Sequence, residues 1–135
     1  MKSLVWLRAD LRLEDNPALK EACLKHEEVQ VVYIFSKNQL VSHNEANVKI
    51  DFIVKNLFLL EKSLSELNIP LTILQSDGFK EDPTLIQDLS LKRSIDTVYW
   101  NKQFGEDESN RDSIAIELLE KNNIKVESFY ESVVY

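Results

Sequence analysis

The sequence predicts an α/β fold: a doubly wound (Rossmann-like) five-stranded parallel sheet in the order 3-2-1-4-5, with helices on both faces. Five short runs of β-forming residues alternate with stretches long enough for helices, and this alternation is typical of parallel sheets. The second run is almost continuously apolar, as expected of a strand that is covered on both faces. Right-handed crossovers then give the strand order.

The five expected strands are rich in Val, Ile, Tyr and Trp, which favour extended structure. In chain order they are "SLVWL" (3–7), "VQVVYIF" (29–35), "PLTIL" (70–74), "DTVYW" (96–100) and "IKVESF" (124–129). Two helix starts lie between them, each with an N-cap residue before a proline at the first helical position: Asn16-Pro17 and Asp82-Pro83.

The clearest expected helix covers 46–67, because its apolar residues step by three and four along the chain. These residues form one stripe: Ile50, Ile53, Leu57, Leu60, Leu64 and Leu67. Val54 and Phe58 are expected to widen the stripe against the sheet. The last helix is expected to run from about Asp107 to about Asn122, with acidic residues in its first turn, where the helix dipole favours them.

Size and charge limit the class of protein. A length of 135 residues indicates one domain covering 1–135. A net charge of -7 without a Lys/Arg-rich tract argues against nucleic-acid binding by this chain alone. The start lacks the apolar stretch of a signal peptide, and no apolar run reaches membrane-spanning length. We therefore expect a cytoplasmic protein with no membrane partner.

The few cysteine, histidine and tryptophan side chains give mostly structural expectations. A single cysteine, Cys23, excludes an internal disulfide and fits a reducing compartment. Cys23, His26 and His43 stand in unrelated contexts, so no metal site is expected. Cys23 is interpreted as a small buried helix residue and His26 as a solvated one. Trp6 and Trp100 are interpreted as core residues of strands and not as redox relays.

The predicted strand order also predicts where a ligand binds. In doubly wound sheets ligands lie beyond the carboxyl ends of the strands, where the strand order reverses. Here that point falls between the first and fourth strands. The site is therefore expected to be lined by 8–12 and 101–108, with help from 36–45 after the second strand.

Several familiar chemistries do not fit these loops. Neither G-x-x-x-x-G-K-[ST] nor G-x-G-x-x-G is present, which argues against the usual NAD and ATP sites. A phospho-accepting receiver domain shares the fold, and Asp10 could belong to its acidic cluster. However, the required aspartate after the third strand and lysine after the fifth strand are not in place. A serine–histidine–acid triad has no nucleophile elbow.

Two stretches that follow the first and fourth strands carry a family resemblance. "VWLRADLRLEDNPAL" (5–19) resembles the N-terminal signature of the DNA photolyase/cryptochrome family and departs from it at Leu7 and Ala9. The matching residues are Trp6, Arg8, Asp10, Leu11, Arg12, Leu13, Asp15, Asn16, Pro17, Ala18 and Leu19. "NKQFGEDESNRD" (101–112) is similar to the family's N-x-x-Y-x-x-x-x-x-x-R-D stretch through Asn101, Arg111 and Asp112, with Phe104 in the aromatic place.

The resemblance implies the light-harvesting antenna domain of a deoxyribodipyrimidine photolyase. Its parent protein would repair cyclobutane pyrimidine dimers by light-driven electron transfer from reduced FAD. FAD and the damaged DNA would bind a C-terminal helical domain that is absent from this chain, so the chain alone is expected to be inactive. The alternatives are the N-terminal domain of a cryptochrome-type photoreceptor, or a free-standing α/β domain that binds nucleotides or proteins.

The resemblance also implies an antenna pigment, 5,10-methenyltetrahydrofolate, or alternatively a deazaflavin or flavin. Folate-binding members place an Asn-Glu pair near the start of the last helix, which falls on Asp107 and Glu108; Asp107 departs from that pattern. They also carry a His-Asn pair after the second strand, which matches His43-Asn44. A carboxylate can accept the adjacent N–H donors of a pterin. The candidate pigment residues are therefore His43, Asp107, Glu108 and Asn101.

Simpler structural interpretations exist for the same charged residues. Asp107 and Glu108 could serve only to complement the dipole of their helix. The charged residues of the first loop, Arg8, Asp10, Arg12 and Asp15, are interpreted as structural ion pairs that brace that loop instead of holding a phosphate.

Overall fold

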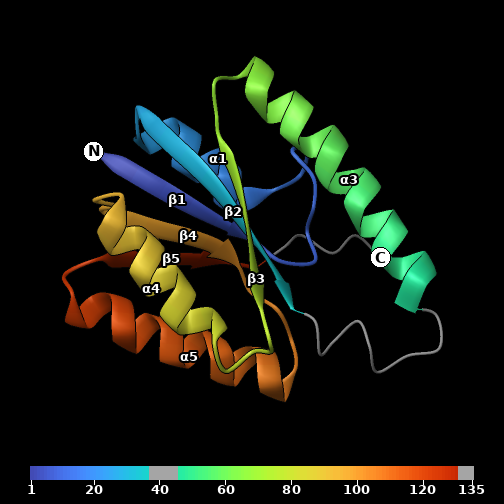
Figure 1. Cartoon of the computed structure of the whole chain (residues 1–135). Coiled ribbons are helices and arrows are strands. Elements are labelled where there is room, and N and C mark those ends of the chain that lie inside the picture. Colours follow the sequence, from blue (N-terminus) through green and yellow to red (C-terminus); the bar gives the residue numbers. More distant parts are fainter. Residues whose placement is uncertain (37–45, 131–135) are drawn as a thin grey trace.

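A computed structural model gives the fold and describes residues 1–36 and 46–130 (Figure 1). Its elements are β1 (Lys2–Leu7), α1 (Pro17–Lys25), β2 (Glu28–Ser36), α3 (Ala46–Glu66), β3 (Leu71–Ser76), α4 (Asp82–Lys92), β4 (Thr97–Asn101), α5 (Glu106–Lys121) and β5 (Lys125–Phe129). All neighbouring strands pair in parallel in the order β3-β2-β1-β4-β5. The predicted fold class and strand order are confirmed.

The sheet is covered on both faces because successive side chains of a strand point to opposite sides. Leu4 and Trp6 of β1 belong to one buried cluster, together with residues of α4 and α5. Val5 and Leu7 belong to a second cluster, together with residues of α1 and α3. Accordingly, α4 and α5 lie on one side of the sheet, while α1 and α3 lie on the other (Figure 1). Trp6 is 1% exposed, as predicted for a core residue.

The helix starts follow the predicted signals with one difference. Asn16 is the N-cap residue of α1, and its side-chain oxygen accepts the backbone N–H of Leu19 at 3.2 Å. The start of α4 was predicted with Asp82 as the cap. This expectation is wrong by one residue, because Glu81 is the N-cap and Asp82 is a buried residue of the helix itself. A proline is tolerated throughout the first turn, so its position alone does not identify the cap.

The apolar stripe of α3 is narrower than predicted. Leu57, Leu60 and Leu64 are buried, but Val54 is 52% and Phe58 is 73% exposed. These two positions lie roughly 90–130° around the helix axis from the centre of the buried stripe. A straight helix contacts a sheet along a limited strip, so the expectation that they widen the contact is wrong. Leu67 follows the last helical residue and is also exposed.

Two expectations about α1 and its end are corrected. Cys23 is exposed, because α1 buries Ala18, Leu19 and Ala22, and Cys23 lies about 100° around the axis from Ala22. His26 is half-buried instead of solvated. Its Nε2 lies 3.0 Å from the hydroxyl oxygen of Tyr99, and the two rings meet edge to face.

We expect His26 to make the stability of the chain sensitive to mild acid. Burial, more than any other cause, lowers the pKa of His26 below its ordinary value of 6.5. The unfolded chain therefore takes up a proton before the folded chain does, so the free energy of unfolding falls as the pH drops below 6.5. Urea unfolding at about pH 7.5 and about pH 5.5 should show a smaller loss in His26→Gln than in the parent chain. Equal losses in the two chains would contradict this assignment.

Candidate functional site

The carboxyl ends of β1 and β4 lie side by side, at the point where the strand order reverses. A small pocket of about 100 Å³ opens there. Its lining comes from the two loops that were predicted from topology: Ala9, Asp10, Arg12, Asn101, Lys102 and Gln103. The two loops that the strand order singled out therefore meet at this pocket.

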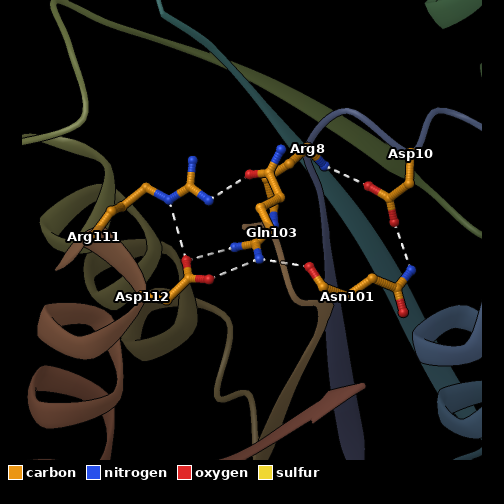
Figure 2. A network of polar contacts seen from close by, with 6 residues as sticks. All are labelled: Arg8, Asp10, Asn101, Gln103, Arg111 and Asp112. Carbon is orange, nitrogen blue, oxygen red and sulfur yellow. Dashed lines mark hydrogen bonds and ion pairs between the residues drawn. The ribbon is translucent and has the colours of Figure 1, made fainter. Parts of the chain in front are cut away.

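Arg8 is the buried centre of the polar network at this point (Figure 2). Its guanidinium donates to both carboxylate oxygens of Asp112, at 2.9 and 3.0 Å, and to the backbone oxygen of Asn101 at 2.7 Å. The guanidinium carbon also lies 4.6 Å from the ring centre of Trp6 and 5.2 Å from that of Trp100. Burial lowers the pKa of Arg8 to about 10, and Asp112 opposes that shift. Arg8 is thus a cation at neutral pH.

Asp10 and Asn101 join the first loop to the end of β4. The carboxylate of Asp10 accepts the backbone N–H of Arg8 at 2.8 Å and the amide Nδ2 of Asn101 at 2.6 Å. The same Nδ2 donates to Asn16 Oδ1 at 2.6 Å, and Asn101 Oδ1 accepts the backbone N–H of Ala18 at 3.0 Å. The buried Asn101 amide thus connects β4, the first loop and the start of α1.

The first loop is braced as predicted, but the expected ion pairs account for only part of the bracing. Arg8 pairs with Asp112, which is distant in the sequence, while Asp10 accepts hydrogen bonds from backbone and amide groups. Arg12 donates to the backbone oxygens of Glu14 and Asp15, at 3.1 Å each. Asp15 takes a left-handed backbone conformation, with φ of 52°. The backbone carbonyls of this tight turn thus accept hydrogen bonds from Arg12, whereas only carboxylate partners were expected from the sequence.

Arg111 and Gln103 extend the network to the β4–α5 connection. Arg111 donates from Nε to Asp112 at 3.2 Å and from Nη2 to Gln103 Oε1 at 2.6 Å. Its guanidinium carbon lies 4.6 Å from the ring centre of Phe79 and 5.1 Å from that of Trp6. Gln103 falls within the expected lining 101–108, but its bond to Arg111 was not predicted, since no spacing rule links a loop glutamine to a helix residue.

Asp107 and Glu108 lie in the first turn of α5, as predicted, next to Glu106. Asp107 is exposed and Glu108 is half-buried. Gly105 precedes the helix with φ of 154°, and a Cβ atom there would overlap the carboxylate of Glu108. Glu108 therefore folds back over the glycine. Within residues 1–36 and 46–130, no hydrogen-bond donor occupies its carboxylate.

An aromatic surface borders the same turn. Phe104, which is 78% exposed, stacks on Tyr130 with ring centres 5.8 Å apart, and Lys102 Nζ lies 4.1 Å from the centre of the Tyr130 ring. A pocket of about 190 Å³ lies beside them and is also lined by Ser109 and Ser113 of α5. Planar ring systems stack favourably on exposed aromatic side chains of this kind.

The remaining expectations concern His43, metals and membranes. His43 lies outside the described residues. The part of the chain that the structure describes holds no group of three or more His, Cys, Asp or Glu side chains arranged for a metal ion. In the same part, no helix combines the length and the apolar character needed to cross a bilayer.

Comparison with known proteins places this arrangement in a family. The family model of DNA photolyase matches residues 3–135. The deoxyribodipyrimidine photo-lyase of Buchnera aphidicola subsp. Baizongia pistaciae is 32% identical over 98% of this chain, which covers 28% of that relative. The chain therefore spans less than a third of the length of that relative.

Solved structures share the fold. The photolyase of the archaeon Sulfolobus tokodaii, described with two FAD molecules that imply a novel light-harvesting cofactor, matches 96% of this chain with a TM-score of 0.79 and 23% identity. The chain covers 29% of that structure. The cryptochrome of Synechocystis sp. PCC6803 matches 96% of this chain with a TM-score of 0.85 and 19% identity, and the chain covers 27% of it. The match to the family model over residues 3–135, on this fold, shows that the chain belongs to the DNA photolyase family.

Proposed function

We propose that this chain is the light-harvesting antenna domain of a deoxyribodipyrimidine photolyase. The whole protein repairs cyclobutane pyrimidine dimers in DNA by light-driven electron transfer from reduced FAD. One observation carries the proposal: the two family motifs, nearly a hundred residues apart, meet in one buried network at the carboxyl edge of the sheet. That edge is where doubly wound folds bind ligands.

FAD and the damaged DNA are assigned to a C-terminal helical domain of the same protein. The chain covers 28% of its photolyase relative, which leaves room for such a domain. Its net charge of -7 repels a phosphate backbone. The sequence also contains no glycine-rich loop of the kind that holds the pyrophosphate of a dinucleotide, which supports assigning FAD to the helical domain. Damaged DNA is therefore contacted through the helical domain, and the 135-residue chain alone is inactive in repair.

The proposed pigment is 5,10-methenyltetrahydrofolate, with a deazaflavin or flavin as the alternative. When bound, the pigment supplies absorption of near-ultraviolet or blue light. Glu108 suits it because its half-buried carboxylate, which has no hydrogen-bond donor among residues 1–36 and 46–130, can accept the N–H donors of a pterin. Asp107, the preceding residue, offers a second acceptor, and His43, which lies outside the described residues, remains a proposed partner. The amide of Asn101 already bonds Asp10, Asn16 and Ala18. Its proposed role is therefore to hold the loop beside the pigment.

Titration of 5,10-methenyltetrahydrofolate, followed by absorbance, tests the proposal. The titration is applied to this chain and to a version extended through the helical domain. The extended version is expected to bind more tightly, because the helical domain would cover more of the pigment surface. In the extended version, Glu108→Ala and His43→Ala should each weaken binding by more than about 1 kcal/mol, since each removes a direct contact. Glu117→Ala, an exposed change further along α5, is the matched control.

Two outcomes would overturn parts of this assignment. Binding that is unchanged in both Glu108→Ala and His43→Ala would reject the folate site. Light-dependent repair of thymine dimers by the 135-residue chain would reject the division between antenna and helical domain. An extended protein that binds pigment and FAD but repairs no dimer would favour the alternative, a cryptochrome-type photoreceptor, which has the same fold.

A further inference from the structure

The segment between β4 and α5 is held at three points by one set of side chains. Arg8 bonds the backbone oxygen of Asn101, where the segment begins. Arg111 bonds Gln103 in its middle, and Arg8 bonds Asp112 on the helix that follows (Figure 2). We name Arg8, Gln103, Arg111 and Asp112 the clamp. The clamp fixes the start and the middle of the segment, and the helix that follows it, relative to β1.

The clamp is stiff because its charged members are buried and packed. Asp112 accepts from both arginines, so its position is set from two sides. The rings of Trp6 and Phe79 lie against the guanidinium group of Arg111, and Trp6 also lies against that of Arg8. Bidentate pairing fixes the orientation of a guanidinium as well as its distance. Gln103 is the only member that is half-exposed.

Two clamp residues, Arg111 and Asp112, lie on α5 together with the two proposed pigment residues Asp107 and Glu108. Residues four apart are neighbours on a helix surface. Glu108 and Asp112 are separated by four positions, and so are Asp107 and Arg111. A rotation or shift of α5 that breaks the clamp would therefore also turn Asp107 and Glu108 away from their present direction.

We propose that the clamp positions Glu108 for pigment binding, and that Gln103 and Arg111 are positioning residues of the antenna site. This inference rests on the proposed function. The clamp members act through α5, since Arg111 and Asp112 are buried in the network. Gln103 joins the loop that carries Phe104 to the helix that carries Glu108. The positions of both residues therefore depend on the hydrogen bond between Gln103 and Arg111.

Three variants of glutamine residues test the inference. Gln103→Ala removes the acceptor for Arg111, whereas Gln103→Glu keeps an oxygen in the same place. Gln87→Ala is the matched control, because Gln87 is also half-buried in the structure but lies on α4, outside the clamp. In the extended protein, we expect Gln103→Ala to weaken methenyltetrahydrofolate binding at least fivefold, Gln103→Glu to restore it, and Gln87→Ala to leave it unchanged.

Two further measurements need no pigment. The chain has two tryptophans, Trp6 and Trp100, and both contact Arg8; their fluorescence therefore reports on the clamp. The backbone N–H of Ser109 bonds Gly105 in the first turn of α5. We expect Gln103→Ala to change the emission and to speed hydrogen exchange at Ser109, and Gln103→Glu to reverse both effects.

The outcomes separate the two proposals. If the unmodified extended protein takes up no methenyltetrahydrofolate, the proposed pigment is wrong, and exchange at Ser109 alone decides whether the clamp positions α5. If that protein binds the pigment and Gln103→Ala binds it equally well, the positioning role is wrong while the proposed function stands. Equal weakening by Gln103→Ala and Gln103→Glu would also overturn the role, because it would separate binding from the hydrogen bond to Arg111.

Discussion

Replacing Arg8 by methionine is expected to lower the free energy of unfolding by about 3–5 kcal/mol. The change keeps an apolar side chain against the rings of Trp6 and Trp100 but removes the bidentate partner of the buried Asp112 carboxylate. Within residues 1–36 and 46–130, Asp112 then keeps only the single, longer contact from Arg111 Nε at 3.2 Å, and the backbone oxygen of Asn101 loses its guanidinium donor. Breaking a buried charge network in this way costs more than removing a surface pair. The free energy is measured by urea unfolding followed by circular dichroism.

Arg12→Met is the matched control for this prediction. Arg12 is an exposed arginine of the same loop, whose contacts include backbone oxygens of the adjoining turn. Changes at exposed sites usually alter stability by no more than about 0.5 kcal/mol. If Arg8→Met and Arg12→Met cost the same, Arg8 does not have the central role that its burial and its three polar partners indicate.

Changing Asn101 to aspartate should be nearly as costly, at about 3–5 kcal/mol. The two side chains have the same shape, but the variant replaces an N–H donor by an oxygen. That oxygen would face the Asp10 carboxylate and Asn16 Oδ1, both of which now lie 2.6 Å from the Asn101 amide nitrogen. Two carboxylates in a buried site repel each other, and neither could donate to the other while ionised. Urea unfolding at neutral pH measures the loss.

Asn56→Asp controls for the chemical change alone. Asn56 also donates from its amide, to the backbone oxygen of Phe52 at 2.9 Å, but this bond is solvent-exposed and Asn56 itself is only half-buried on α3. We expect a loss below about 1 kcal/mol there, because water satisfies the groups that are left unpaired. A loss at Asn101 as small as that at Asn56 would show that the Asn101 amide contributes no more than a surface contact.

The fold was predictable because its signals are local. Alternating runs, the proline after Asn16 and the spacing of Leu57, Leu60 and Leu64 each describe neighbours in the sequence, and the structure confirms each of them. Apart from the N-cap of α4, which is Glu81 and not Asp82, the errors in the fold concern which side chains are exposed. Whether Cys23 or Phe58 is buried depends on the rotation of its helix about the helix axis. That rotation is set by all the side chains packed between the helix and the sheet.

The sequence predicted where the candidate site lies, but not which of its side chains bond each other. Topology located the edge between β1 and β4, and the motifs identified Arg8, Asn101 and Asp112 as residues of interest. However, nothing in the spacing shows that Arg8 bonds a carboxylate 104 positions away. Ion-pair partners are set by packing and by the charges that burial leaves unpaired, which a pattern in one segment does not contain. The hydrogen bond between Gln103 and Arg111 was not predicted for the same reason.

The strand order has a consequence for how the polypeptide is made. β1 forms the middle of the sheet, yet its second neighbour, β4, is synthesised only after about seven-tenths of the chain, with Ser3 opposite Thr97. Until then, one edge of the nascent β1–β2 pair has no hydrogen-bonding partner, and such edges promote aggregation. Pairings this distant also close slowly. Translation speed and chaperone access before β4 leaves the ribosome should therefore influence the yield of folded protein.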